Sequence, residues 1–423
     1  MSVIPDKISD ALQQLDLGKT LWIAYSGGVD STVLLHAAVS AAEISGHRLQ
    51  AIHINHQIHS DSNLWTGVCE QQCKQLSVPL KTIAIQMEAV ADLGIEGAAR
   101  VARYQAFAQC LGKDDVLFTA HHADDQIETV LLQLFRGAGV QGLSGCASTR
   151  ELGQSQVIRP LLTISREQIM EYARQHQLEW LEDPSNDSLA HDRNYLRHKV
   201  LPLLHERWPG LRETMARSSQ WQTESARLLD RLAGMELNGN LLTNPLPVEH
   251  LKGLERASVK NILRCWIRQF NFPMPSAQIL NHIMSDVIDS ADDVQGCVQW
   301  QTCECRKYRN HLYLQNQLLP HDPAQNYEWD VQSPLYIPSL DLQLTRDKLE
   351  AHGVNCDQFE IVQVRFRQGG EIMRPKGRGC QKDLKSLFQE AAVEPWLRDR
   401  IPLIYHNNSL VFVWGYWVHE AYQ

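Results

Sequence analysis

Short apolar runs and longer helical patterns alternate along the first half of the chain. The apolar runs predict strands at Leu21–Tyr25, Leu49–Ile54, Leu80–Ile85 and Val116–Ala120. Between and after them, apolar residues recur at helical spacing over Ser31–Ala42, Asn63–Leu76, Gly97–Leu111 and Asp124–Phe135. Strands that alternate with helices pair in parallel, because each helix returns the chain to the start of the sheet. The pattern therefore predicts an α/β fold on a parallel sheet.

The pattern changes in the second half, which predicts several domains. With about 100–200 residues per domain, 423 residues allow two to four of them. Helical patterns follow at Leu211–Leu232, Glu255–Phe270, Ser276–Asp289 and Asp383–Ala391, and strand-like runs surround Tyr308–His311 and occupy Ile361–Phe366 and Leu410–Trp417. We expect an α/β domain over 1–210, a linking helix over 211–234, a small, mostly helical domain over 235–320, a connection over 321–354 that is Pro-rich up to Pro338, and an α+β domain over 355–423.

A glycine-rich loop joins the first predicted strand to the first predicted helix. Its candidate phosphate-binding residues are Ser26, Gly27, Gly28, Val29, Asp30, Ser31 and Thr32. The glycines let backbone N–H groups approach phosphate oxygens, and the helix start adds a positive dipole. An acid beside phosphates is explained if it holds Mg²⁺, so Asp30 is the candidate metal ligand. The alternative is an ordinary turn that Ser26 or Asp30 caps.

A Walker loop is excluded as the explanation. The chain has one Gly-Lys-Thr, at Gly18–Thr20, but Gln13 stands where the first glycine of that motif belongs. The Gly-Lys-Thr also lies before the strand instead of after it.

A second polar cluster, His121–Thr129, follows the predicted strand Val116–Ala120 and so lies at the same edge of the sheet. If Asp125 is in the first turn of the next helix, Glu128 lies on the same helix face. Two such carboxylates can bind an ammonium group or a metal, and the alternative is a helix cap with a surface acid. Their position beside the phosphate loop favours a substrate site.

The chain resembles the PP-loop ATP pyrophosphatases and, within that superfamily, the tRNA(Ile)-lysidine synthases. The motifs that carry the resemblance are Ser26–Thr32, His53–His56, Gly94–Tyr104, His121–Thr129, Arg136–Leu143, Arg159–Leu162, Glu182–Asn186, Arg193–Arg197, Lys376–Gly379 and Lys382–Phe388. Gln57, Ile58, Gln133 and Tyr195 depart from the usual pattern, and none of them replaces a carboxylate or a phosphate-loop residue. The resemblance covers most of the chain and is weakest between residues 235 and 350.

The resemblance implies a fold with an adenine nucleotide α-hydrolase-like catalytic domain, a ligase activity and two substrates besides ATP. The reaction adenylates the C2 oxygen of the cytidine at the first anticodon position of a CAU-anticodon tRNA(Ile). Lysine then replaces that oxygen, which changes decoding from AUG to AUA. ATP and Mg²⁺ are the implied cofactors, and L-lysine and tRNA are the implied partners, with a homodimer as an open question.

The resemblance also assigns roles to residues. Catalytic roles fall to Asp30, Arg100, Asp125, Glu128 and Arg193, and His53 and Asn55 border the nucleotide. Either of the two acids of the second cluster can bind lysine or accept its proton. Residues that approach lysine or tRNA are Asp125, Glu128, Asn186, Asn194, Arg197, Arg374, Lys376, Arg378, Lys382 and Lys385.

Composition and charge limit the other possibilities. The chain is 43% hydrophobic and 21% charged, and no apolar run reaches the roughly 18 residues of a membrane span. The first ten residues do not resemble a signal peptide, so we expect a cytoplasmic protein with reduced, scattered cysteines and no membrane partner. A net charge of −9 argues against indiscriminate RNA binding, but residues 363–385 hold seven Lys or Arg against two acids.

Three other functions remain as alternatives. A PP-loop tRNA thiolase also adenylates a base, but it needs a reactive cysteine or an iron–sulfur cluster, and Cys110 and Cys146 lack a Cys-x-x-Cys context. A small-molecule amide ligase leaves the basic tail without a purpose. A non-catalytic RNA-binding protein does not need the intact phosphate-loop and carboxylate motifs.

Overall fold

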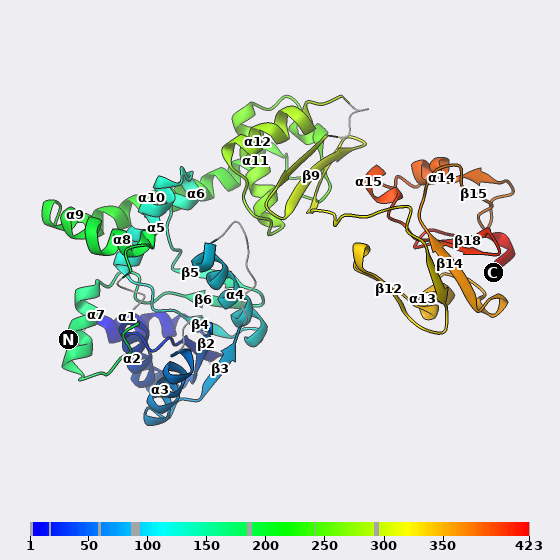
Figure 1. Ribbon diagram of the computed structural model, residues 1–423. Helices are drawn as coiled ribbons and strands as arrows, with labels where there is room; N and C mark the ends of the chain where they lie inside the picture. Colours follow the sequence, from blue (N-terminus) through cyan, green and yellow to red (C-terminus); the bar gives the residue numbers. More distant parts are fainter. Residues whose placement is uncertain are drawn as a thin grey trace. The chain divides into compact units, whose positions relative to one another are not determined.

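The computed structural model describes residues 3–16, 18–57, 61–85, 94–183, 188–240, 242–291 and 296–422. The chain divides into two compact units, Met1–Leu232 and Ala233–Gln423, and each is described by itself (Figure 1). Over the described residues, no helix is long and apolar enough to cross a lipid bilayer.

A six-stranded sheet forms the centre of the first unit. Its order is β3-β2-β1-β4-β6-β5, with β1 (Thr20–Ala24), β2 (Arg48–Asn55), β3 (Leu80–Ala84), β4 (Val116–Phe118), β5 (Thr149–Leu152) and β6 (Ser155–Ile158). All neighbours are parallel except β5 and β6, which form an antiparallel pair. The four predicted strands and their parallel pairing are confirmed, whereas β5 and β6 were not predicted.

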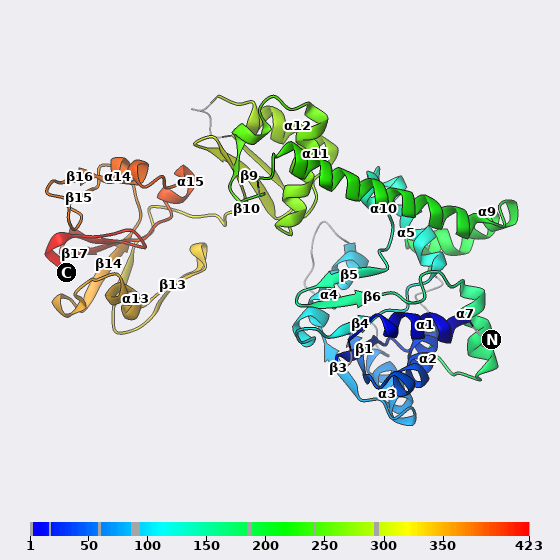
Figure 2. The same cartoon turned by 180° about the vertical axis from the view of Figure 1, so that it is seen from behind.

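Helices cover both faces of this sheet, which gives three layers (Figures 1 and 2). The helices are α1 (Val3–Gln13), α2 (Val29–Ser45), α3 (Ser62–Gln75), α4 (Gly94–Cys110), α5 (Ala123–Phe135) and α7 (Arg166–Gln175). Apolar residues of α1, α2, α3 and α7 share one core with β1 and β4. Residues of α4 pack with the opposite side chains of β1, β2 and β4 in a second core. Burial on both faces of the sheet explains why the strands read as near-continuous apolar runs.

The strand order places the two sequence motifs side by side. From β1 the chain proceeds outward to β2 and β3, and then returns to β4 on the other side of β1. A reversal of this kind leaves a crevice at the carboxyl ends of the two central strands. The phosphate loop follows β1, and the second polar cluster follows β4. The expectation that both motifs lie at one edge of the sheet is therefore confirmed.

Short helical segments and one long helix complete the first unit. They are α6 (Val140–Leu143), α8 (Asp192–Tyr195), a π-helical turn over Leu196–Val200, α9 (Leu201–Arg207) and α10 (Leu211–Glu236). The predicted helix over Leu211–Leu232 is confirmed and continues for one more turn. Its last residues belong to the second unit, where Ala233 is buried.

The second unit begins with two helices packed on a four-stranded sheet. The helices are α11 (Arg256–Gln269) and α12 (Ala277–His282), the latter continued by a π-helical segment, Ile283–Ile288. The sheet order is β7-β10-β9-β8, with β7 (Leu246–Pro247), β8 (Cys297–Trp300), β9 (Cys303–Tyr308) and β10 (His311–Asn316). The strands β9 and β10 form the hairpin that the sequence predicted around Tyr308–His311.

A five-stranded antiparallel sheet forms the end of the chain. Its order is β11-β14-β17-β18-β19, with β11 (Tyr327–Asp330), β14 (Ile361–Arg365), β17 (Leu403–His406), β18 (Ser409–Val413) and β19 (Trp417–Val418). Around it lie α13 (Arg346–Ala351), α14 (Leu384–Glu390), α15 (Pro395–Arg398) and the strand pairs β12 (Leu335–Ile337) with β13 (Leu342–Leu344) and β15 (Ile372–Met373) with β16 (Lys382–Asp383). The sequence predicted only one helix here.

The segment 321–354, expected to be a connection, contributes to this last sheet. Its strand β11 pairs with β14, and Trp329, Ile337, Leu344 and Leu349 are buried in the same core as β14. Pro334 and Pro338 flank β12 and leave only three residues between them, so the strand pattern is too short to recognise there. The α+β domain therefore begins before residue 355.

Replacement of Trp329 tests whether this segment is structural. Trp329 is fully buried and its indole Nε1 donates to the Ser333 carbonyl at 2.7 Å. We expect Trp329→Ala to lower the free energy of unfolding of this domain by about 3–5 kcal/mol. Trp221→Ala is the matched control, because Trp221 is 63% exposed and its loss costs less than about 0.5 kcal/mol. Chemical unfolding followed by circular dichroism measures both, and equal stabilities would contradict a structural role.

Candidate active site

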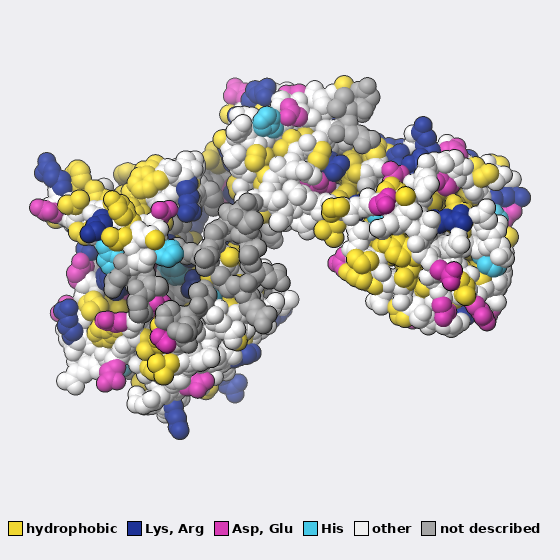
Figure 3. Space-filling model, in the orientation of Figure 1, with side chains coloured by type: hydrophobic (Ala, Val, Ile, Leu, Met, Phe, Trp, Pro, Cys, Tyr) yellow, Lys and Arg dark blue, Asp and Glu magenta, His cyan; other side chains and the backbone are white. Residues whose placement is uncertain are grey.

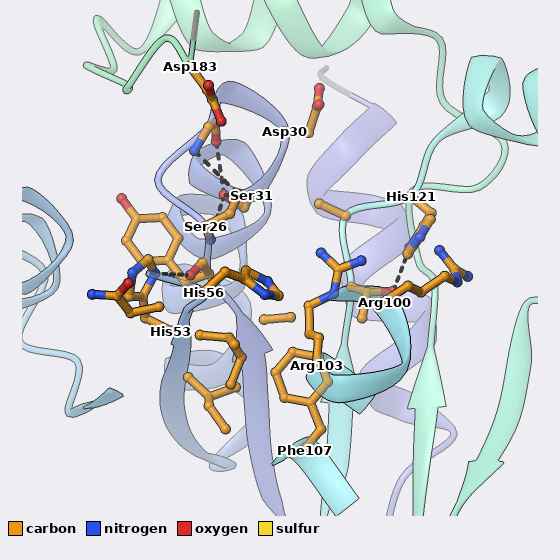
Figure 4. Close-up of a pocket in the computed structure, with 18 of the residues that line it drawn as sticks. Ser26, Asp30, Ser31, His53, His56, Arg100, Arg103, Phe107, His121 and Asp183 are labelled. Carbon is orange, nitrogen blue, oxygen red and sulfur yellow. Dashed lines mark hydrogen bonds between the residues drawn. The ribbon is translucent and has the colours of Figure 1, made fainter. Parts of the chain in front are cut away.

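A cavity of about 530 Å³ opens where β1, β2 and β4 end (Figure 4). The phosphate loop lines one part of it, through Ser26, Gly28, Asp30 and Ser31. The described residues that line the rest come from the ends of β2 and β4 and from α3, α4 and the segment around Asp183 and Arg193; they include His53, Asn55, His56, Trp65, Arg100, Arg103, Tyr104, Phe107, His121 and Asp125.

The phosphate loop has the form that anion binding requires. Gly27 has a φ of 83°, which glycine adopts without strain. The Ser31 hydroxyl donates to the Gly28 carbonyl at 2.9 Å, and Ser31 Oγ accepts the Ser26 N–H at 3.2 Å. Gly28 is the N-cap of α2 and offers no side-chain cap. The first N–H groups of the helix are therefore directed toward the cavity mouth without a side chain across them.

A distant segment holds the loop from behind. The Leu181 N–H donates to the Gly27 carbonyl at 2.9 Å. The Tyr25 hydroxyl donates to Gln72, whose Nε2 donates to the Glu179 carbonyl at 2.8 Å. The segment 179–183, which precedes the motif residue Asn186, is thus tied to the phosphate loop. Asn186 itself lies outside the described residues.

The two polar residues at the end of β2 are fixed by hydrogen bonds. The carbonyl of Tyr25 can only accept, so His53 Nδ1, 2.9 Å away, carries the proton. Burial lowers the pKa of His53, which keeps the ring neutral. Asn55 donates to Asn63 and to Thr66 at 3.1 and 3.2 Å. Both side chains line the cavity, as expected of residues that border a nucleotide.

Arg100 enters the cavity from α4, and a tyrosine supports it. Its guanidinium lies 5.3 Å from the centre of the Tyr104 ring. Arg150 lies 5.5 Å from the same ring, and the buried Arg159 donates to the Tyr104 hydroxyl at 3.3 Å. In Figure 4, Arg103 extends from the helix into the middle of the cavity, and Arg100 lies on the side of His121, across from Ser26 and Ser31. A polyanion in the cavity would meet both cations.

Asp125 and Glu128 lie on one face of α5, as predicted, and two arginines hold them. Arg197 donates to both Glu128 oxygens at 2.7 and 3.1 Å and to Asp125 at 3.2 Å, and Arg193 lies 3.4 Å from Glu128. Glu128 is completely buried, and burial raises its pKa while Arg197 opposes that rise. Asp125 also accepts the His122 N–H at 3.0 Å, which begins the helix.

The remaining acids at this edge are paired in the same way. Arg166 Nη1 lies 3.0 Å from each Asp30 oxygen. Asp124 accepts Arg212 Nε at 2.9 Å and the Arg166 N–H at 3.0 Å. The buried His122 lies within 4 Å of Asp30, Asp124 and Asp125. Asp30 on α2 and Asp124 on α5 are therefore each paired with an arginine from a later helix.

Asp30 fits a magnesium ion only in combination with phosphate. Within the described part of the chain, no three His, Cys, Asp or Glu side chains are grouped to hold a metal. Mg²⁺ commonly uses one or two carboxylates and takes its other ligands from phosphates and water. Asp30 lines the cavity beside the phosphate loop and is partly exposed, so the donor set meets that requirement.

The comparisons with known proteins agree with one another and together cover nearly the whole chain. Residues 3–204 match the PP-loop domain, a family that uses ATP; residues 246–313 match the TilS substrate binding domain; and residues 362–423 match the TilS substrate C-terminal domain. The tRNA(Ile)-lysidine synthase of Coxiella burnetii is 38% identical over 421 residues, which cover 99% of this chain and 94% of that protein. That of Serratia proteamaculans is 38% identical over 97% of this chain and 94% of its own length.

The chain belongs to the tRNA(Ile)-lysidine synthase family. The resemblance inferred from the sequence motifs is thereby confirmed, and so is the PP-loop fold of the first domain.

The structure brings some of the sequence-predicted residues together and separates others. Of the predicted residues that it describes, Ser26, Gly28, Asp30, Ser31, His53, Asn55, Arg100, Asp125 and Arg193 line the cavity. Gly27, Val29 and Thr32 support the loop from within, and Asn194 donates to the Ser188 carbonyl at 3.0 Å. Glu128 and Arg197 form the ion pair behind Asp125. Arg166 and Arg212, which pair with Asp30 and Asp124, were not predicted, because both lie outside the sequence motifs.

Acids accompany several of the predicted tRNA contacts in the tail. Arg374 pairs with Glu420 at 2.9 Å, and both Arg378 and Lys382 pair with Glu390. Lys376 and Lys385 are exposed. On the face shown in Figure 3, cationic and acidic side chains are interspersed and no single basic field stands out. The local excess of positive charge is therefore smaller than the sequence count indicated.

The two loop glycines make a matched test of the close packing behind the phosphate site. A Cβ at Gly27 would lie 2.7 Å from Leu181 Cδ1 and 2.9 Å from Cys69 Sγ, whereas one at Gly28 would meet its nearest atom at 3.6 Å. We expect Gly27→Ala to lower the free energy of unfolding by about 1–3 kcal/mol, and Gly28→Ala to change it by less than about 0.5 kcal/mol. Thermal unfolding of the two variants measures the difference, and equal losses would contradict the packing argument.

Glu128 and Arg197 form a buried ion pair, and we expect a double-mutant cycle to show that their contributions to the free energy of unfolding are strongly coupled. Arg197→Met leaves the Glu128 carboxylate buried with only Arg193 beside it, so we expect a loss of about 3–5 kcal/mol. Adding Glu128→Gln removes the uncompensated charge and should recover part of that loss. Arg346→Met is the control, because the Arg346–Glu350 pair is solvent-accessible and contributes less than about 1 kcal/mol. Additive losses at Glu128 and Arg197 would show that the pair is not coupled.

Proposed function

We propose that this chain is a tRNA(Ile)-lysidine synthase that joins lysine to the C2 carbon of the first anticodon cytidine of a CAU-anticodon tRNA. The observation that carries the proposal is the meeting of a phosphate loop and a paired-carboxylate helix at one cavity, in a chain whose relatives of this name match it nearly end to end. The two later domains match substrate domains of the same family, which supports a tRNA substrate.

The first step activates the base. The C2 oxygen of cytidine is a poor leaving group, and its attack on the α-phosphate of ATP converts it into an adenylate and releases pyrophosphate. The N–H groups at the start of α2 and the hydroxyls of Ser26 and Ser31 would hold the departing pyrophosphate. Arg100 would stabilise the charge that develops on the phosphates. A bound Mg²⁺, held by Asp30, would neutralise part of this charge.

The second step is attack by the lysine amine, with departure of AMP. The amine must lose a proton before it can attack carbon, and a carboxylate within reach can accept that proton. Asp125 lines the cavity, whereas Glu128 is enclosed by Arg193 and Arg197. We therefore assign contact with lysine to Asp125, and to Glu128 the task of positioning the two arginines.

A sulfur-transferring function has less support. Such an enzyme requires a thiolate, and burial raises the pKa of Cys69 to about 12 and of Cys73 to about 11. Neither thiol lines the cavity, because Cys69 lies against Gly27 from behind and Cys73 is buried in the core. Cys146 does not line the cavity either; its sulfur lies 3.5 Å from the Thr129 hydroxyl, and it forms no disulfide.

The test uses purified protein, ATP, Mg²⁺, labelled lysine and a CAU-anticodon tRNA. We expect label to enter this tRNA, with AMP and pyrophosphate formed, and to be absent from a tRNA with uridine at the first anticodon position. Asp30→Ala is the control variant, and we expect it to release no pyrophosphate. Pyrophosphate without lysine incorporation would retain the adenylation step and contradict the assignment of lysine as nucleophile.

A further inference from the structure

Two cavities share a wall that is made of ion pairs. Asp30 and Asp125 line the 530 Å³ cavity in front of the phosphate loop. Their partners, Arg166 and Arg197, line a second cavity of about 480 Å³. The Asp30–Arg166 and Asp125–Arg197 pairs thus lie between the two spaces. Arg166 lies 3.0 Å from the phosphate-loop acid Asp30 and takes no part in the two steps proposed above.

The backbone of Arg166 is fixed, whereas its side chain is held only by the contact with Asp30 among the interactions described above and has room to turn. Arg166 is the first residue of α7, and its N–H donates to the buried Asp124. Ser165 caps this helix in a reciprocal pair with Gln168, at 3.2 and 2.9 Å. The side chain is 37% exposed, and the second cavity gives it room. Movement of Arg166 therefore requires new torsions in one side chain and no change of the helix.

Two cations compete for the oxygens of Asp30. Arg166 Nη1 is equidistant from both of them, so the oxygens that a divalent cation would use are already taken by a guanidinium. When the divalent ion takes Asp30, the guanidinium loses its anion beside an incoming polyphosphate. Phosphate oxygens then become the nearest acceptors, and a planar guanidinium binds them with two parallel hydrogen bonds.

We propose that Arg166 is a transferable counter-ion of the phosphate loop: it neutralises Asp30 in the free enzyme and moves to the pyrophosphate portion of ATP when the metal–nucleotide complex binds. The inference rests on the proposed use of ATP at this loop. It explains how a carboxylate can lie at an anion site without repelling ATP, because a positive charge accompanies Asp30 before the metal arrives. It also gives the leaving pyrophosphate a cation from outside the loop.

The proposal predicts opposite changes in two binding constants for Arg166→Gln. Without the competing guanidinium, the nucleotide-free protein should bind Mn²⁺, used as a paramagnetic probe in electron paramagnetic resonance titrations, about threefold more tightly. Pyrophosphate in the presence of Mg²⁺, measured by calorimetry, should bind about tenfold more weakly, because one charge-assisted contact is lost. Arg174→Gln, at the exposed end of the same helix, should leave both constants unchanged.

A second variant distinguishes loss of the Arg166 side chain's function from a general folding defect. Arg166→Lys keeps a positive charge near Asp30 but lacks the two-pronged fork. We expect Mn²⁺ affinity close to that of the unmodified protein, together with weaker pyrophosphate binding. If Mn²⁺ affinity is unchanged in Arg166→Gln, or falls together with pyrophosphate affinity, the transfer is refuted. Neither measurement uses lysine or tRNA, so failure of lysine transfer leaves this test intact, and its own failure leaves lysine transfer untouched.

Discussion

The neutralisation of a group of acids governs the architecture of the catalytic unit. Asp30, Asp124, Asp125 and Glu128 lie within two adjoining helix starts, and Glu128 is wholly buried. Carboxylates this close together and this poorly hydrated destabilise a fold unless cations and hydrogen-bond donors compensate them. The chain supplies that compensation from segments that follow the parallel sheet.

The arginines that balance these acids come from a single stretch of the chain. Arg166, Arg193, Arg197 and Arg212 belong to α7, α8, the π-helical turn and α10, all C-terminal to the sheet. The helices after the sheet are thus held to the catalytic edge by charge as well as by apolar packing. Removal of this region would leave the acids facing one another, so these helices belong with the sheet in the first compact unit.

The sequence predicted the features that depend on local patterns, namely the strands, and on the order of those strands, namely the motifs at one edge of the sheet. Periodicity located the four parallel strands, and the reversal of strand order brought Asp30 and Asp125 to one cavity. It could not reveal which arginine meets which acid. Arg166 begins an ordinary amphipathic helix, and its partner is 136 positions away. The spacing of Asp125 and Glu128 was predicted correctly, but the burial of Glu128 depends on arginines that approach from other elements. Similarly, Trp329 reads as part of a Pro-rich connection until its pairing with β14 is known.

The two large sheets differ in the order in which they can be assembled during synthesis. In the sheet at the end of the chain, β11, β14, β17, β18 and β19 are neighbours in the order in which they are made. In the first sheet, β1 is central, and Leu21 pairs with Val116 of β4. One edge of β1 therefore leaves the ribosome long before its second partner, with its backbone groups exposed to any other strand. Helices α2 and α3, which are made before β4 and pack on the same core, are therefore the parts of the catalytic unit available to cover β1 until β4 has been made.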